Sequence, residues 1–289
     1  MSYRITTDST CDMPDAFYEE RGIAHVNLSL EFNGKEYKDG FNENLSAHTF
    51  YESLRNGGMA STTQVNPAEF IDFVEPFLAA GEDVLHLALS SGLSGTYASC
   101  ETAAKDLREK YPERTLVVID SLAASMGEGL LLYYADENRK KGLSLEENAR
   151  WLEDNKLHLC HWFTVNDLMF LHRGGRVSKT SAIFGSLLGI KPVMHVDNEG
   201  HLIVMSKARG RGASLEALVD HMEKTGNPDI KDQMIFISHG DCLEDVEKLK
   251  AIIRRRIGCE NFMVNPVGAV IGSHSGPGTV ALFFLGSER

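Results

Sequence analysis

Short apolar runs alternate with helical patterns through the first half of the chain. The runs are Tyr3–Thr7, Val84–Leu89 and Leu116–Ile119, and each is followed by a small polar cluster and then by helical periodicity. This order is typical of a parallel α/β layer, in which the strand ends carry the chemistry. Between the first two runs, Ile23–Tyr37 alternates in hydropathy and contains the hairpin signal Asn33-Gly34, which predicts a small β excursion packed on the main sheet.

Strand-like runs follow one another more closely after Lys156. The residues Asp197–Gly200 predict a turn between two of them, and strands joined by so short a turn are antiparallel. We therefore predict an N-terminal α/β domain over residues 1–157, with its β excursion at about 23–45, and a C-terminal α+β domain over 158–289. No linker rich in Pro, Gly or Ser separates them, which indicates a tight interface. The strand-like runs are Cys160–Val165, Ile190–Val196, His201–Ser206, Met234–Ser238, Phe262–Ala269 and Val280–Phe284.

The charge balance bears on the partners of the chain. Its 289 residues include 29 Lys and Arg against 41 Asp and Glu, which gives a formal net charge of −12. Such a charge repels phosphate backbones at long range, and the longest basic run, Arg254-Arg255-Arg256, spans only one helical turn. We therefore expect no nucleic-acid partner.

The cysteines and the N-terminal residues indicate in which cellular compartment the protein is expected. The five cysteines are an odd number, widely scattered and never in a CxxC pair, so neither a disulfide framework nor a zinc site is expected. Met1–Arg4 leads into a strand-like segment rather than an apolar signal sequence, and no run approaches the ~20 apolar residues that span a bilayer. We expect a cytoplasmic protein without a transmembrane segment, with at most transient contact with a membrane surface.

The segment Val84–Tyr97 carries the most informative local signal. A buried strand runs into a turn rich in glycine and hydroxyl residues, and a helix follows. Backbone N–H groups at a helix start lack intrahelical partners and carry partial positive charge, so this turn suits a carboxylate or phosphate, with Ser94 and Thr96 as added donors. Two alternatives stay open at this point. Ser94 caps the helix, or it is a nucleophile on a strand-to-helix elbow, although Gly92–Thr96 lacks the last glycine of the hydrolase pattern.

Further clusters of hydroxyl residues and glycine repeat this character. Each cluster alone predicts a turn, but there are more clusters than turns alone would need. Several fall where parallel strands end, which is the usual ligand edge of an open α/β sheet. The clusters are Asp8–Thr10, Ser61–Gln64, Asp120–Gly127 and Gly272–Gly278.

Two cations stand beside paired glycines in the second half. Arg173 and Arg176 flank Gly174-Gly175, which makes this stretch a candidate docking or anion-contacting loop. The segment Ala182–Ile190 that follows is apolar on nearly all sides and contains glycines. Such a segment predicts either a core helix or the wall of a cavity, and both interpretations remain open.

Motifs for metals and nucleotides are missing from the sequence. There is no HExxH, Asp-rich calcium loop, Walker A or G-x-G-x-x-G opening a helix after a strand. We expect no metal, no cofactor and no nucleotide-dependent catalysis by this chain alone. His86 alternates within an apolar strand, which predicts a hydrogen-bonded core histidine rather than a catalytic base.

A set of short motifs is spread over nearly the whole chain. They are Asp8–Asp12, Tyr37–Gly40, Thr62–Gln64, Ser90–Tyr97, Asp120-Ser121, Gly174–Arg176, Gly185–Pro192, Lys207 with Arg209, and His274–Gly278. At these residues the sequence resembles the DegV family, bacterial fatty-acid-binding proteins that include the fatty-acid-carrying subunit of fatty acid kinase. Three positions depart from the usual family pattern, since Thr63 replaces a Ser, Val65 replaces a Pro and Ser275 replaces a Thr.

The resemblance implies a two-domain fold with a ligand tunnel between the domains. By this analogy Thr62 and Ser94 hold the carboxylate of a long-chain fatty acid of the palmitate, stearate or oleate class, and His274 belongs to the same polar end. The loop of Arg173 and Arg176 resembles the surface where a kinase partner docks. The remaining expected ligand-binding residues are Thr63, Gly95, Ser121, Phe184, Leu188, Ile190 and Ser275.

These observations favour a lipid carrier without catalytic activity of its own. On this hypothesis the protein presents its fatty acid to a separate ATP-dependent kinase, which forms an acyl phosphate. The first alternative is an enzyme, either a Ser94-dependent acyl hydrolase or another enzyme that acts on a small anion. The second is a purely structural protein that a partner recognises through the loop of Arg173 and Arg176.

Overall fold

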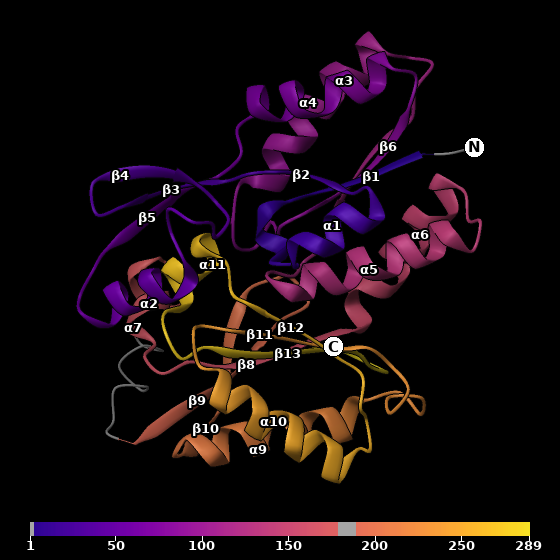
Figure 1. Cartoon of the computed structure of the whole chain (residues 1–289). Coiled ribbons are helices and arrows are strands. Elements are labelled where there is room, and N and C mark those ends of the chain that lie inside the picture. The colour runs from indigo at the N-terminus through magenta and orange to yellow at the C-terminus, as the bar shows by residue number, and fades with distance from the viewer. Residues whose placement is uncertain (1–2, 179–188) are drawn as a thin grey trace.

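The chain folds into two stacked α/β layers with a small third sheet at one side (Figure 1). The computed structural model describes residues 3–178 and 189–289. The first layer is a parallel sheet in the order β2-β1-β6-β7, which confirms the predicted parallel α/β unit. Its strands are β1 (Tyr3–Asp8), β2 (Ala24–Val26), β6 (Asp83–Ala88) and β7 (Leu116–Asp120).

Helices cover both faces of this first sheet. Asn66 and Ser144 begin α3 and α6 with capping boxes, in which each side chain accepts a hydrogen bond from the backbone N–H of Glu69 or Glu147. The helices on the outer face are α3 (Pro67–Ala79) and α4 (Thr96–Lys110), and those on the inner face are α5 (Met126–Lys140) and α6 (Leu145–Asn155) (Figure 1). Two short elements follow β1, namely the 3₁₀ turn η1 (Ser9–Cys11) and α1 (Asp15–Arg21).

The second layer is a mixed sheet in the order β10-β9-β8-β13-β11-β12. β9 and β10 are antiparallel across the predicted turn at Asp197–Gly200, and β11 pairs parallel with β12. α9 (Arg211–Thr225) and α10 (Leu243–Arg256) cover the outer face at the bottom of Figure 1. The strands are β8 (Leu159–Thr164), β9 (Ile190–Val196), β10 (Leu202–Arg209), β11 (Ile235–His239), β12 (Phe262–Pro266) and β13 (Val280–Leu285). Three short helical elements accompany them: η2 (Lys156–His158) precedes β8, α7 (Met169–Arg173) follows β8, and α11 (Ala269–Ser275) follows β12.

The small sheet has the order β4-β3-β5 and differs in extent from the predicted β excursion. The hairpin of β3 (Ser29–Phe32) and β4 (Lys35–Lys38) turns at Asn33-Gly34, where both residues have positive φ (51° and 73°) as a tight hairpin requires. β2, however, pairs with β1 in the main sheet. β5 (Ala60–Thr63) comes from beyond residue 45 and completes the small sheet, with α2 (Ala47–Arg55) between β4 and β5 in the chain.

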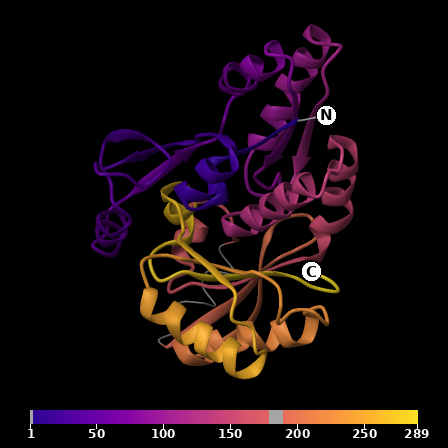
Figure 2. The same cartoon turned by 45° about the vertical axis from the view of Figure 1, so that its right-hand side comes forward.

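α5 lies between the two main sheets and joins their cores (Figure 2). A Cβ at Gly127 would lie 2.9 Å from Cδ1 of Phe283, so glycine is what allows this close approach of helix to sheet. The first sheet uses only residues before 157 and the second only residues after it. We propose that the two units divide between residues 157 and 158.

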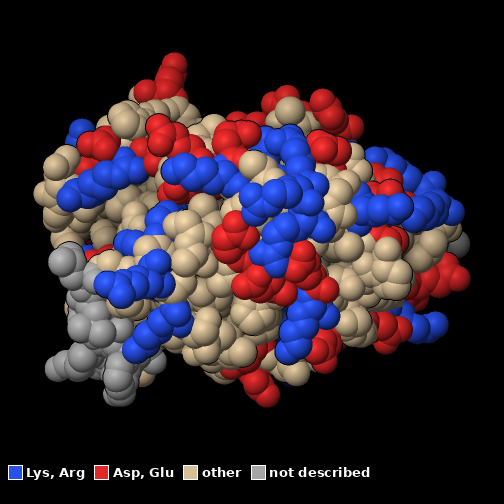
Figure 3. All heavy atoms as spheres, turned by 90° about the horizontal axis from the view of Figure 1, so that it is seen from below, with Lys and Arg blue, Asp and Glu red and all other residues tan. Residues whose placement is uncertain are grey.

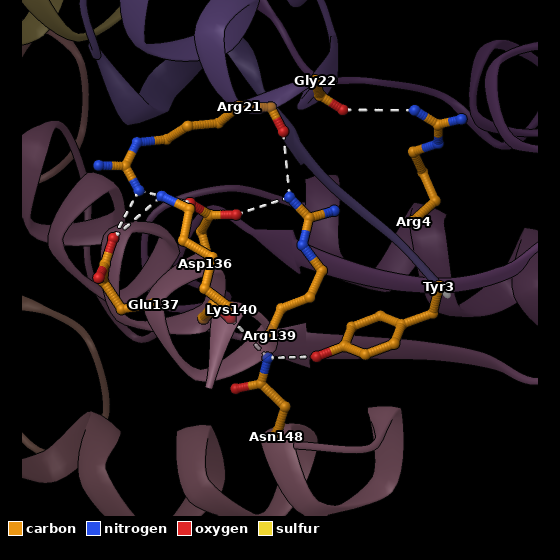
Figure 4. Close-up of polar contacts among 10 residues, drawn as sticks. Tyr3, Arg4, Arg21, Gly22, Asp136, Glu137, Arg139, Lys140 and Asn148 are labelled. Atoms are coloured by element: carbon orange, nitrogen blue, oxygen red, sulfur yellow. Dashed lines mark hydrogen bonds and ion pairs between the residues drawn. The ribbon is translucent and has the colours of Figure 1, made fainter. Parts of the chain in front are cut away.

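A polar network fastens α1 to α5 (Figure 4). The fully buried Asp136 of α5 pairs with Arg21 of α1 and with Arg139 and Lys140 on its own helix. Arg139 also donates a hydrogen bond to the backbone oxygen of Arg21 at 3.0 Å. Burial alone would raise the pKa of Asp136, but hydrogen bonds from Lys140, Arg21 and Arg139 bring it below its ordinary value.

Acidic and basic side chains alternate over the face of α9 and α10 (Figure 3). Arg256 pairs with Glu216, Asp220 and Glu223 of α9, and Arg255 pairs with Glu216. The basic run is therefore neutralised by its own neighbours. Among the helices of residues 3–178 and 189–289, none has both the length and the apolar character that a bilayer crossing needs.

Candidate functional site

A cavity of about 890 Å³, counted with its open mouth, lies between the two layers. Its walls come from β5, the loop between β6 and α4, β8, α11 and β13, so both units contribute to it. Most of the wall is apolar, with Leu28, Leu89, Leu93, Phe163, Val267 and Val270 among the lining residues. No acidic side chain of the described residues lines it.

Thr62 and His274 meet at one end of the cavity. Thr62 lies on β5 and His274 in the last turn of α11, and Oγ1 of Thr62 is 2.8 Å from Nε2 of His274. If Nε2 carries the proton and donates it to Thr62, the hydroxyl hydrogen of Thr62 is left to donate to a ligand in the cavity. In that tautomer this end of the cavity offers a neutral hydrogen-bond donor to a ligand.

Burial keeps His274 neutral. Desolvation, with a smaller contribution from the nearby Arg176, lowers the pKa of His274 from 6.5 to about 4. Its Nδ1 is buried without a hydrogen-bond partner in the described part of the chain. A Cβ at Gly174 would lie 2.1 Å from this Nδ1, so glycine is what leaves the imidazole its place.

Ser94 lies in the turn between β6 and α4 and also lines the cavity. Its Oγ accepts a hydrogen bond from the backbone N–H of Thr96 at 3.2 Å and lies 3.0 Å from Thr96 Oγ1. The Ser94 hydroxyl therefore supports the start of α4 while it faces the cavity. Within the described residues, no histidine lies within hydrogen-bond distance of Ser94, so the contact between nucleophile and base that a serine hydrolase uses is missing there.

Arg176 reaches inward from the loop after α7. Its guanidinium donates from Nε and Nη2 to the backbone oxygen of Leu93, at 3.1 Å and 2.9 Å, next to Ser94. Burial lowers the pKa of Arg176. No carboxylate of residues 3–178 and 189–289 forms an ion pair with Arg176 or with the exposed Arg173. Arg176 thus lies near Ser94 without an acidic side chain of the described residues to balance its charge.

The other expected site residues divide into three groups. Ser275 lines the cavity, and its Oγ is buried without a partner in the described structure. Gly95 follows Ser94 and packs against Gln64, while Thr63, Ser121 and Ile190 lie outside the cavity lining. Phe184 and Leu188 lie outside the described residues.

Three residues that were not among the expected ligand-binding residues also line the cavity, and one of them, Gln64, belongs to the motif Thr62–Gln64. Gln64 stands beside Thr62 and Ser94, and its Nε2 donates to Ser99 Oγ at 3.0 Å. Ser125 and Ser238 form a second polar spot, with their Oγ atoms 2.9 Å apart. Ser125 belongs to the hydroxyl-rich cluster after β7, so that cluster could have indicated it, whereas nothing in the sequence pattern indicates Ser238.

No metal centre accompanies this site in the described structure. Within residues 3–178 and 189–289, no three His, Cys, Asp or Glu side chains come together in an arrangement that could hold a metal ion. His86 is buried, with Nδ1 3.0 Å from Thr6 Oγ1, as expected for a core histidine.

Comparison with known proteins gives matches over the whole chain. The family described as "Uncharacterised protein, DegV family" matches residues 2–287. A DegV domain-containing protein of Clostridium perfringens is 43% identical over 99% of this chain and 98% of its own length. A DegV family protein from Thermus thermophilus, whose structure is described as one of fatty acid binding, superposes with a TM-score of 0.86 at 30% identity, over 99% of this chain and 100% of that one.

A more distant structure shares the fold. The fatty acid kinase B3 protein of Streptococcus pneumoniae, loaded with linoleic acid, superposes with a TM-score of 0.85 over 99% of each chain. At 21% identity this likeness concerns the fold alone.

Proposed function

This chain belongs to the DegV family, and from that premise we propose that it binds one long-chain fatty acid in the cavity between its layers. The observation that carries the proposal is an apolar cavity of about 890 Å³ with Thr62, Ser94 and His274 along its wall. The Thermus thermophilus relative with the same fold is described as binding fatty acid, which supports the same ligand class here.

The energetics agree with a buried tail. At ~0.8 kcal/mol per buried methylene, a tail of about fourteen methylenes offers on the order of 11 kcal/mol, from which several kcal/mol are lost on immobilisation. A buried carboxylate without partners would cost several kcal/mol, so it needs donors. In this proposal the hydroxyls of Thr62 and Ser94 donate to it, and Ser275 completes the polar end.

The test is the ligand content of the purified protein. We expect native mass spectrometry of protein from a bacterial host to show one acyl chain per molecule, and gas chromatography of the extract to identify a long-chain fatty acid. A protein that arrives empty and refuses palmitate, stearate and oleate alike would overturn the proposal. The chromatographic profile also gives the preferred chain length and saturation.

We further propose that the protein is a carrier that presents its ligand to a separate ATP-dependent kinase. In that reaction a carboxylate oxygen attacks the γ-phosphorus of ATP, an O–P bond forms, and the bond to the ADP oxygen breaks. Neutral donors suit this role because Thr62 and His274 can accompany a carboxylate or an acyl phosphate without a fixed ion pair. The loop of Arg173 and Arg176 is the proposed docking surface for the kinase.

A reconstitution tests the carrier role. The loaded protein is incubated with a bacterial fatty acid kinase and ATP, and acyl phosphate is trapped with hydroxylamine. We expect product only when both proteins are present, and product with the carrier alone would contradict the proposal. A chromogenic acyl ester tests the hydrolase alternative, for which turnover would have to be lost in Ser94→Ala.

A further inference from the structure

The cavity between the layers has polar groups besides the proposed head-group residues Thr62 and Ser94. Ser125, Ser238 and His161 all line it, and all three are buried. Ser125 directly precedes α5, Ser238 lies on β11 and His161 on β8, so both units contribute to this inner polar cluster. If Thr62 and Ser94 hold the carboxylate, the inner polar cluster is left to face the tail.

The pairing of β8, β13 and β11 sets where the side chains of the cluster lie. Ser238 pairs with Ala281 on β13, and Ala281 pairs with Phe163 on β8, so these three side chains share one face of the sheet. His161 lies two residues from Phe163 and therefore on the same face, one row along the strands. Because Ala281 has only a methyl group, it leaves room in the cavity between Ser238 and His161.

Ser125 holds its place in the cluster at the cost of backbone strain. Its φ of 54° and ψ of −147° lie in a region that favours glycine, and such strain persists where the surroundings fix a residue, often at a ligand site. Its hydroxyl donates to Oδ2 of the buried Asp12 and lies 2.9 Å from Oγ of Ser238. A serine hydroxyl has only one hydrogen, so Asp12 engages that of Ser125, and Ser238 keeps a lone pair with which it can accept from a ligand.

His161 has ring nitrogens without partners. Nδ1 is buried without a hydrogen bond in the described structure and lies 3.2 Å from the position of a Cβ at Gly127, and Nε2 makes no hydrogen bond with residues 3–178 and 189–289. Burial lowers the pKa of His161 well below its ordinary 6.5, so the ring is neutral. A neutral imidazole has one donor and one acceptor nitrogen, and both are available here.

A plain hydrocarbon tail fits these groups poorly. Methylene groups that pass over Ser238 and His161 displace any water bound there and offer no hydrogen bond in return. A buried polar group without a partner costs binding free energy, and a site that can bond a substrate hydroxyl therefore rejects the analogue that lacks it. A tail with its own hydroxyl at this point satisfies both side chains.

We infer that the preferred ligand is a long-chain fatty acid that carries a hydroxyl group on its tail. The hydroxyl lies over Ala281, donates its hydrogen to Oγ of Ser238, and accepts a hydrogen bond from the ring of His161. This inference rests on the proposed fatty acid binding, and it assigns a role to a part of the cavity wall that a plain tail leaves unused.

The experiment compares stearate with a series of monohydroxystearates in which the hydroxyl stands on every second carbon along the chain. Each acid, and oleate as an unsaturated acid without a hydroxyl, is titrated calorimetrically into delipidated protein. The variants are Ser238→Ala, Ser238→Thr, which keeps a hydroxyl, and His161→Phe, which keeps a buried ring without nitrogens. Ser121→Ala is the control, because Ser121 belongs to the same hydroxyl-rich cluster after β7 as Ser125 and lies outside the cavity lining.

We expect one isomer to bind the wild type at least about tenfold more tightly than stearate, which corresponds to about 1.4 kcal/mol. Ser238→Ala and His161→Phe should each lower this ratio about three- to tenfold, because each removes one partner of the hydroxyl. Ser238→Thr and Ser121→Ala should keep the ratio. A wild type that binds stearate at least as tightly as every isomer would overturn the inference, and so would a preference that survives both Ser238→Ala and His161→Phe.

The oleate titration separates a hydroxyl from a double bond as the group that the cluster recognises. If Ser238→Ala and His161→Phe weaken oleate and leave the hydroxystearates unchanged, the inference is wrong. Failure of this inference also differs from failure of the proposed function. A wild type that binds stearate and oleate without preferring any isomer refutes the tail hydroxyl alone, whereas a wild type that binds none of these acids refutes fatty acid binding itself.

Discussion

Replacement of Ser94 by alanine tests the polar end of the cavity most directly. The two described hydrogen-bond contacts of the Ser94 hydroxyl are both with Thr96, so the fold loses at most about 0.5–1.5 kcal/mol of stability. A carboxylate that loses one buried donor loses about 1–3 kcal/mol of binding. At 1.4 kcal/mol per factor of ten, the dissociation constant should rise about 5- to 150-fold.

The same reasoning predicts that Ser94 and Thr62 act on one group. Thr62→Val is nearly isosteric and removes the hydroxyl that lies 2.8 Å from His274 Nε2. If both hydroxyls hold the same carboxylate, the effects in Ser94→Ala, Thr62→Val and the double variant should deviate from additivity by at least about 0.5 kcal/mol. Additive effects would mean that the two hydroxyls serve different parts of the ligand.

The assay is a calorimetric titration of delipidated protein with palmitate, paired with urea unfolding of each variant. Ser121→Ala is the matched control, because Ser121 Oγ contacts only the backbone of Ala123 in the described structure and lies outside the cavity lining. We expect no change in affinity for this control. An unchanged affinity in Ser94→Ala, with the fold intact, would refute the placement of the head group.

Three further perturbations have defined outcomes. Ala281→Phe adds a ring to the cavity wall on β13, so the acyl chains found by native mass spectrometry should be shorter or absent, while the thermal unfolding temperature stays the same. An unchanged distribution of acyl chain lengths would place the tail elsewhere. Asp136→Asn leaves three cations without their buried acid and should cost about 2–3 kcal/mol in urea unfolding at pH 7, less than a fully buried pair because the cations are partly exposed. Because the pKa of Asp136 is lowered from its ordinary 3.8, this difference should shrink as the pH falls below that value, and a difference that stays constant with falling pH would refute the ionic origin. Burial raises the pKa of Asp39 from 3.8 to about 6, so the folded state binds the extra proton and this group makes stability fall as the pH rises from about 4 to 6. Asp39→Asn should therefore remove this fall in stability between about pH 4 and pH 6, and parallel urea titrations in which wild type and variant keep the same pH dependence would refute the assignment.

The main sheets could be predicted because their strands are long apolar runs with clear boundaries. The first unit follows from β1, β6 and β7, and the antiparallel character of the second from the turn at Asp197–Gly200. β2 could not be placed, because a strand of only three residues has no measurable period. β5 was missed for a different reason. Its sequence ASTT is too polar to stand out as a strand and is fixed by pairing with β3.

The sequence analysis also did not predict α11. The apolar run predicted as a strand over Phe262–Ala269 ends at Pro266, and a helix occupies Ala269–Ser275 where a turn rich in glycine and hydroxyl residues was predicted. Glycine and serine are poor helix formers, so local propensity argues against this helix. Packing favours it instead, because a Cβ at Gly272 would lie 2.4 Å from Tyr51 Oη, and only glycine lets the helix approach α2 so closely.

The site depends on contacts between residues far apart in the chain, which no local sequence pattern predicts. Thr62 and His274 are 212 positions apart, and only the assembled fold brings β5 against α11. Thr62 and Thr63 must point to opposite faces of β5, since side chains alternate along a strand, but the sequence does not tell which of them faces the cavity. The hydroxyl cluster after β7 raises the same problem, because Ser125 lines the cavity and Ser121 does not.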